Sequence, residues 1–201
     1  MKTRSSGYQL MESLRVHDEA REERRAGSMR AAIAEVTLEG DYAQFGVYRG
    51  RTARMILDLM SPGRTLHLFD SFEGLPEDWT PNRKAGAFKL NSEEIPSFDP
   101  ERVVLHKGWF KDTVPVWGRQ ATVPLAFIHL DADLYSSTID ALFNIDHLIL
   151  QGTIILFDEY AGPKRDEEHR ALVDWGEKFN RRYEYLWRSS GPQVCIRIGG
   201  R

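Results

Sequence analysis

The stretch "PLAFIHLDADLYSST", residues 124–138, is an apolar run that ends in two aspartates and continues into a helical pattern. We expect a buried strand over the apolar residues and a helix over about Ser136 to Leu150. The order recurs at "TIILFDEY", residues 153–160, which precedes a charged helix over roughly residues 164–179. Because strands alternate with helices, the sequence predicts a parallel sheet with helices on both faces.

Further apolar runs extend this pattern toward both ends of the chain. A helix over Thr52 to Met60 separates the first two of these runs, and Ser137 and Asp140 are expected to cap the helix after the two aspartates. With the two strands already named, the runs give a mostly parallel seven-stranded sheet and an α/β fold. They cover residues 42–48, 65–70, 102–108, 183–187 and 193–198.

The domain organisation follows from length and from one irregular segment. A chain of 201 residues suits one globular domain. We expect N-terminal helices over 8–25 and 28–36, both within residues 1–40 and packed on a core formed by residues 41–201. Residues 74–102 are rich in proline and have little periodicity, and we interpret them as a lid or substrate wall, with a tolerated surface insertion as the alternative.

The composition of the chain limits the kinds of partner and the cellular compartment that we expect. The net charge of −3 provides no basic surplus for a phosphate backbone, so nucleic-acid binding is disfavoured and small molecules are expected. The single cysteine, Cys195, fits a reducing compartment. No stretch resembles a signal peptide or a membrane span, so we expect a cytoplasmic protein without a membrane partner. A homo-oligomer is compatible with the sequence.

Glycines and an acid at two strand ends indicate a nucleoside site. Gly46 and Gly50 in "QFGVYRG" allow a sharp turn close to a ligand, and Asp70 follows at a spacing typical of a carboxylate that accepts ribose hydroxyls. The complete dinucleotide fingerprint is missing, which disfavours a pyrophosphate. An adenosine compound without phosphates, such as S-adenosylmethionine, fits better.

Three carboxylates are expected at the same edge of the sheet. Asp131 ends one strand, and Asp158 and Glu159 end the next. Like charges about 4 Å apart repel by roughly 4 kcal/mol at a dielectric constant near 20, which favours protonation or a bound cation. Oxygen ligands point to a hard ion, Mg²⁺ above all, while helix capping is the alternative. His129 shares the strand face of Asp131 and is expected to be a core residue that could orient it.

The order of motifs resembles the macrocin O-methyltransferase family of class I S-adenosylmethionine-dependent enzymes, which methylate sugar hydroxyls on natural products. The resemblance covers about Tyr42 to Gly162 and implies a Rossmann-like class I methyltransferase fold. Five blocks carry it in order: "FGVYRG", "LHLFDSFEGLP", "VVLHKGWFKDTVP", "FIHLDADLYSST" and "GTIILFDEYAG".

The resemblance also implies roles for individual residues. Asp131, Asp158 and Glu159 match the metal ligands, and Asp133 matches the general base. This chain has Gln44 where the family usually has Glu, and Glu159 where it usually has Asp. The implied cofactor-binding set is Gln44, Phe45, Gly46, Tyr48, Gly50, Asp70, Ser71, Phe72, Gly108, Trp109 and Phe110.

These residues predict direct transfer of the sulfonium methyl group to a hydroxyl of a sugar or other polyol. Mg²⁺ would activate the hydroxyl and Asp133 would take its proton. A metal-dependent sugar-nucleotide glycosyltransferase or phosphohydrolase would also use a D-x-D motif. An inactive module that binds S-adenosylmethionine is the third alternative.

Overall fold

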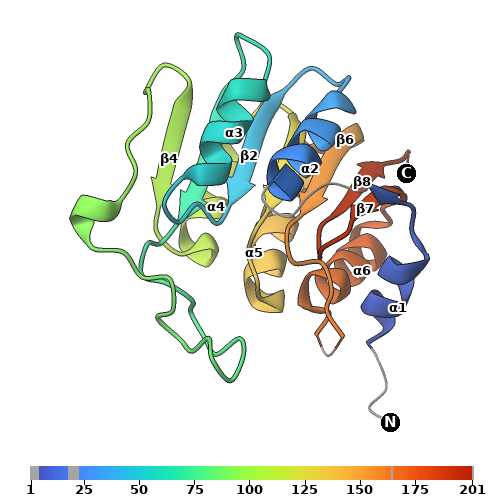
Figure 1. Cartoon of the computed structure of the whole chain (residues 1–201). Helices are drawn as coiled ribbons and strands as arrows, with labels where there is room; N and C mark the ends of the chain where they lie inside the picture. Colours follow the sequence, from blue (N-terminus) through green and yellow to red (C-terminus); the bar gives the residue numbers. More distant parts are fainter. Residues whose placement is uncertain (1–4, 18–22, 164, 201) are drawn as a thin grey trace.

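The computed structural model describes residues 5–17, 23–163 and 165–200 and has one mixed sheet between two layers of helices (Figure 1). The strands are β1 (Val16–His17), β2 (Asp41–Phe45), β3 (Leu66–Asp70), β4 (Val103–Lys107), β5 (Leu125–Leu130), β6 (Ile149–Phe157), β7 (Tyr183–Ser189) and β8 (Val194–Ile198). The helices are α1 (Ser6–Ser13), α2 (Glu23–Ala34), α3 (Arg51–Leu59), α4 (Phe110–Gln120), α5 (Tyr135–Ile145) and α6 (Glu167–Phe179), with short 3-10 helices at Ser92–Glu94 and Asp146–Leu148.

The sheet order is β1-β7-β8-β6-β5-β2-β3-β4. Strands β6, β5, β2, β3 and β4 pair in parallel, and β8 pairs antiparallel with both β6 and β7. The predicted seven strands are confirmed, and the two-residue β1 adds an eighth at the β7 edge. After β4 the chain crosses back over β2 and β3 to form β5, so strand order reverses between β2 and β5, the position at which α/β sheets bind ligands.

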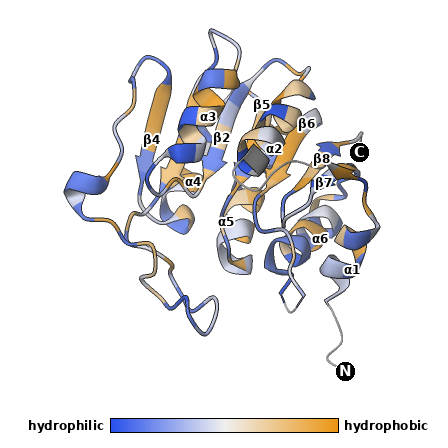
Figure 2. Cartoon of the chain, viewed as in Figure 1, coloured by the Kyte–Doolittle hydropathy of each residue, from blue (hydrophilic) through white to orange (hydrophobic). Residues whose placement is uncertain are grey.

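Two apolar clusters lie on the two faces of the sheet. One joins buried residues of β5 and β6 to α1, α4, α5 and α6, with Trp175 fully buried in it. The other joins the opposite face to α2 and α3, with Met29 and Ile56 at its centre. Hydropathy follows this division, since the central strands are apolar while the helices turn polar residues outward (Figure 2). Among the described helices, none combines the length and apolar character that crossing a bilayer requires.

Helix boundaries differ from the sequence-based expectation in several places. Helix α2 covers Glu23–Ala34 where 28–36 was expected, and α5 ends at Ile145, because residues 149 and 150 already belong to β6. The single N-terminal helix expected over 8–25 is wrong, because α1 ends at Ser13 and β1 follows; residues 18–22 of that range lie outside the described residues. The capping pair Ser137 and Asp140 is also wrong. Helix α5 begins at Tyr135, its N-cap is Leu134, and no side chain caps it.

Backbone hydrogen bonds continue beyond the strand ends and align them. The amide of Gly46 donates to the Phe69 carbonyl at 3.0 Å, and the amide of Asp131 donates to the Phe45 carbonyl at 2.9 Å. The amide of Asp158 donates to the Leu130 carbonyl at 2.8 Å. The residues that follow β2, β3, β5 and β6 are therefore fixed side by side at one edge of the sheet.

Candidate active site

A cavity of about 830 Å³ opens at this edge, and turns after β2, β3, β5 and β6 form its floor. Its other wall comes from the segment between β3 and β4, which extends beyond the body of the sheet in Figure 1. The predicted site residues that line it are Gly46, Tyr48, Asp70, Ser71, Trp109, Phe110, Asp131, Asp133 and Glu159.

Gly46 brings the first turn against the acidic centre. Its φ is +90°, in the left-handed region that favours glycine, and a Cβ at this position would lie 2.0 Å from the carbonyl oxygen of Asp131. Gly50 has a different role. It precedes α3 with a φ of +75°, and a Cβ there would meet Phe98 at 2.8 Å and Pro96 at 3.1 Å, so it packs on the long segment and not on the cavity.

Asp70 holds the glycine turn by its carboxylate. One oxygen, Oδ2, accepts the amides of Val47 and Tyr48, both at 2.8 Å, and Oδ1 accepts the amide of Phe72 at 2.7 Å. Tyr48 and Phe72 have φ values of +50° and +58°, conformations that such fixed amides help to maintain. A carboxylate offers about four acceptor positions. The carboxylate therefore keeps room for about one more donor, on Oδ1.

Three predicted cofactor residues support the turns from behind the cavity. Gln44 is fully buried, and its Nε2 donates to the Gly46 carbonyl at 2.8 Å and to Thr52 Oγ1 at 2.6 Å, which ties the turn to α3. Phe45 is fully buried and stacks on the Phe69 ring at 4.7 Å. The Phe72 side chain is 2% exposed and belongs to the core. None of the three side chains is part of the cavity wall.

Gly108 shapes the turn that carries the aromatic wall. Its φ is +144°, and a Cβ there would lie 2.8 Å from the Thr113 side chain. Its amide donates to the Asp70 carbonyl at 3.0 Å, so the turn after β4 is joined to the turn after β3. Trp109 and Phe110 then begin α4 on the cavity wall.

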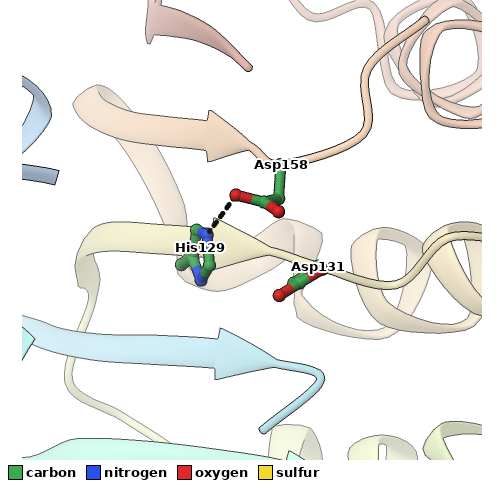
Figure 3. A group of neighbouring side chains, drawn as sticks. All are labelled: His129, Asp131 and Asp158. Atoms are coloured by element: carbon green, nitrogen blue, oxygen red, sulfur yellow. Dashed lines mark ion pairs between the residues drawn. The ribbon is translucent and has the colours of Figure 1, made fainter. Parts of the chain in front are cut away.

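The acidic centre brings together His129, Asp131 and Asp158 (Figure 3). One ligand atom from each lies within 4.8 Å of the others, and Nε2 of His129 is 3.7 Å from Oδ1 of Asp158. Both His129 ring nitrogens are buried without a hydrogen-bond partner. Two carboxylates and an orphaned imidazole fit a divalent cation. Glu159, the third ligand expected from the sequence, lies outside this close group and lines the cavity.

Arg25 of α2 provides a positive charge inside the centre. Its Nη2 lies 2.5 Å from Oδ2 of Asp158, whose side chain is 2% exposed. Burial raises the pKa of Asp158, but His129 and Arg25 outweigh it and lower that pKa below the usual value. The opposite holds for Asp131: burial and the negative charges of Asp158 and Asp133 raise its pKa well above the usual range.

Asp133 projects from a tight turn into the cavity. Its φ is +61°, and the amide of Leu134 donates to the Ala132 carbonyl at 2.6 Å. Burial, followed by the charges of Glu159 and Asp158, raises the pKa of Asp133 to about 7. Burial and Asp158 likewise raise the pKa of Glu159 to about 7. A carboxylate with a pKa near the working pH is suited to general base catalysis.

Glu168 joins the two acidic turns and was missed by the sequence analysis. It is fully buried at the start of α6, where Oε1 accepts the Ala132 amide at 3.3 Å and Oε2 accepts the Glu159 amide at 3.2 Å. Burial and the charges of Asp131 and Asp133 raise its pKa well above the usual value. Within the run "RDEEHR" nothing distinguishes this buried acid from Asp166 and Glu167, which are only partly buried.

The fold and this site define a class I S-adenosylmethionine-dependent O-methyltransferase, and comparison with known proteins agrees. The family model described as Macrocin-O-methyltransferase (TylF) matches residues 20–175. The chain therefore belongs to the macrocin O-methyltransferase family.

Individual relatives lie in the same group. Demethyldecarbamoylnovobiocin O-methyltransferase of Streptomyces niveus is 30% identical over 75% of this chain and 67% of that enzyme. A tetracenomycin-C 4'-O-methyltransferase of Streptomyces olivaceus, named for its 2,3-dimethoxy-rhamnosyl substrate, is 31% identical over 61% of this chain and 53% of its own length. The crystal structure of CalS11, a calicheamicin methyltransferase, has a TM-score of 0.74 at 24% identity over 86% of this chain and 77% of that chain, which supports the fold.

Proposed function

We propose that the chain transfers the methyl group of S-adenosylmethionine to a hydroxyl of a sugar or other polyol in a natural product, with Asp133 as general base. The main support is the contact of Gly46 with Asp131, where a Cβ would lie 2.0 Å from the carbonyl oxygen. Because of this contact, the glycine turn that would hold the methyl donor and the acidic centre both border the same cavity. Donor and acceptor can then meet in near-attack geometry.

The donor-binding residues follow from the cavity wall. We assign donor contacts to Gly46, Tyr48, Asp70 and Ser71, with Trp109 and Phe110 on the adenine side. The ribose would use the remaining acceptor position on Oδ1 of Asp70. Supporting residues complete the set: Gly50 and Gly108 set turn geometry, while Gln44, Phe45 and Phe72 hold the turns in place.

We propose Asp131 and Asp158 as ligands of a Mg²⁺ ion, completed by Glu159 or His129. When bound, the ion would lower the pKa of a coordinated hydroxyl. Asp131, which lines the cavity, would orient the acceptor from its floor, and Asp133 would receive the hydroxyl proton; Asp158 is buried behind them and would act through the ion alone. His129 is placed for the ligand role because its Nε2 lies 3.7 Å from Oδ1 of Asp158 and both of its ring nitrogens lack a hydrogen-bond partner.

We propose that residues 74–102 act as a lid, and that residues 1–40 form helices packed on the domain of residues 41–201. In support, Trp79 and Phe88 line the cavity, and Ser136 Oγ donates to Oε1 of Glu77 at 2.6 Å, linking the lid to α5. Met11 of α1 and Met29 of α2 are buried in the two core clusters. We place the reaction in the cytoplasm because the chain has one cysteine, which is buried and unpaired.

The test combines a binding measurement with turnover. Asp133→Asn should bind S-adenosylhomocysteine as wild type does in calorimetry, while turnover on glycosylated acceptors should fall by about 10²- to 10⁴-fold. Excess EDTA should stop turnover, and added Mg²⁺ should restore it. Unchanged turnover in Asp133→Asn would refute the general base. Binding without turnover on any acceptor would identify an inactive module.

The glycosyltransferase and phosphohydrolase alternatives are set aside. Both were based on the D-x-D spacing of Asp131 and Asp133, which the O-methyltransferase family also contains. Family membership over residues 20–175 accounts for the glycine turn and for both acidic strand ends together.

A further inference from the structure

Two arginines on the cavity wall, Arg83 and Arg165, differ from two lysines of residues 74–102, whose charges are already paired. Lys84 pairs with Asp78 at 2.8 Å, and Lys89 pairs with Glu73 at 2.5 Å. Among the described residues, Arg83 and Arg165 have no carboxylate within ion-pair distance, and both line the cavity. Their charges are therefore not neutralised by a contact within this part of the chain.

Aromatic rings hold both guanidinium groups in place. The Arg165 guanidinium carbon lies 4.3 Å from the centre of the Trp79 ring, and that of Arg83 lies 5.0 Å from the centre of the Phe88 ring. The Trp79 amide donates to the Arg83 carbonyl at 2.9 Å, so one turn positions both groups. An arginine stacked on a ring keeps its N–H groups in the plane, free for an anion.

Buried hydrogen-bond donors without a partner also indicate that an anion could bind here. Arg165 Nη1 and Trp79 Nε1 are both buried and have no hydrogen-bond partner. Leaving a buried donor unpaired costs about 1–3 kcal/mol, more when it is charged. A ligand oxygen would remove that cost, and a phosphate or carboxylate matches the fork of a guanidinium best.

The location separates this group from the methyl donor. Gly46 follows β2 and Asp70 ends β3, whereas Arg165 follows β6, on the side of the cavity formed by the turns of Asp133 and Glu159. Arg165 lines the cavity together with both of those carboxyls. The guanidinium is therefore on the flank where the acceptor must lie.

We propose that Arg83, Arg165 and Trp79 form an anion subsite for the acceptor, so that the preferred acceptor carries a phosphate or carboxylate. The proposal rests on the methyltransferase function proposed above. Trp79 and Arg83 come from the lid and Arg165 from the loop before α6, so an anionic acceptor would also join the two loops over the cavity.

Calorimetry on the complex with S-adenosylhomocysteine tests the proposal. Three probes share one sugar ring: UDP-glucose, methyl glucuronide and neutral methyl glucoside. We expect at least one anionic probe to bind roughly ten- to a hundredfold more tightly than the neutral one, the equivalent of one or two charge-assisted hydrogen bonds. The two anionic arms distinguish a nucleotide-linked sugar from a carboxylated glycoside.

Matched variants locate the effect. Arg165→Gln and Arg83→Gln should each remove most of the preference for the anionic probe, while Lys84→Gln, whose charge is already paired with Asp78, should retain it. S-adenosylhomocysteine affinity should stay within about twofold in all three, the limit expected for residues outside the donor site.

Three results would overturn the subsite. The first is that neither anionic probe binds more tightly than methyl glucoside. The second is equal loss in Lys84→Gln and Arg165→Gln, which would indicate general attraction to the surface. The third is a large loss of S-adenosylhomocysteine affinity in Arg165→Gln, which would assign the guanidinium to the donor's carboxylate. In each case the effect of Asp133→Asn on turnover is independent, so the methyltransferase proposal is tested separately.

Discussion

Gly46→Ala tests the contact that joins the donor turn to the acidic centre. Alanine must adopt the φ of +90°, which costs about 1–2 kcal/mol. Its Cβ would lie 2.0 Å from the Asp131 carbonyl oxygen, so backbone atoms must move apart, and overpacking of this kind costs about 1–3 kcal/mol more. We expect a loss of about 2–5 kcal/mol in the free energy of unfolding.

Gly63→Ala is the matched control. Gly63 also has a positive φ, +77°, but a Cβ there would meet nothing within 4 Å. The control therefore carries the backbone cost alone, about 1–2 kcal/mol. Urea denaturation followed by circular dichroism measures both variants, and calorimetry measures their affinity for S-adenosylhomocysteine. If Gly46→Ala is no less stable than Gly63→Ala and binds equally well, the two turns are not in contact and the proposed site geometry is wrong.

Three further predictions concern the acidic centre. Arg25→Gln should raise the affinity for Mn²⁺ or Mg²⁺ by roughly two- to tenfold in calorimetry, because the half-exposed guanidinium competes with the ion for Asp158. The control Arg30→Gln, on the exposed side of α2, should leave the metal affinity unchanged. Asp133→Asn should have a higher melting temperature than wild type, and the difference should grow from about pH 4 to about pH 7 and stay constant above that. The reason is that the pKa of Asp133 is raised to about 7 in the folded state, so ionisation of this carboxyl destabilises the folded protein across this range. A difference independent of pH would contradict that pKa. Glu168→Ala should weaken metal binding by roughly 10- to 100-fold through misplacement of the two acidic turns, and equal weakening in the neighbouring Glu167→Ala would show that only charge matters.

Local pattern was sufficient for the central sheet, but helix α4 was missed. Its sequence, "FKDTVPVWGRQ", contains Pro115 and Gly118, two residues that normally argue against a helix. A Cβ on Gly118 would lie 2.6 Å from the carbonyl oxygen of Asn144 in α5. The glycine therefore permits close packing of the two helices, a tertiary reason that is absent from the local sequence.

Strand ends were enough to predict that Asp131 and Asp158 meet, because parallel neighbours end at the same edge of a sheet. The surroundings of this pair could not be predicted. Arg25 is 133 positions from Asp158 in sequence, and it lies in a mixed charge run that reads as solvated surface. The role of Glu168 could not be predicted from the sequence either, because only the folded structure shows that its oxygens accept two backbone amides.

The charge balance of the centre explains how these carboxyl groups can be buried together. Asp131, Asp133, Asp158 and Glu168 converge, and each unscreened pair about 4 Å apart would cost roughly 4 kcal/mol at a dielectric constant near 20. Burial and like charge raise the pKa of Asp131, Asp133 and Glu168, so protons neutralise part of the cluster, while Arg25 pairs with Asp158 at 2.5 Å. The divalent cation proposed above would have to displace the protons of this cluster as well as the Arg25 guanidinium. In the proposed mechanism, metal binding and ionisation of Asp133 would therefore be coupled, so that Asp133 becomes basic when the ion is bound.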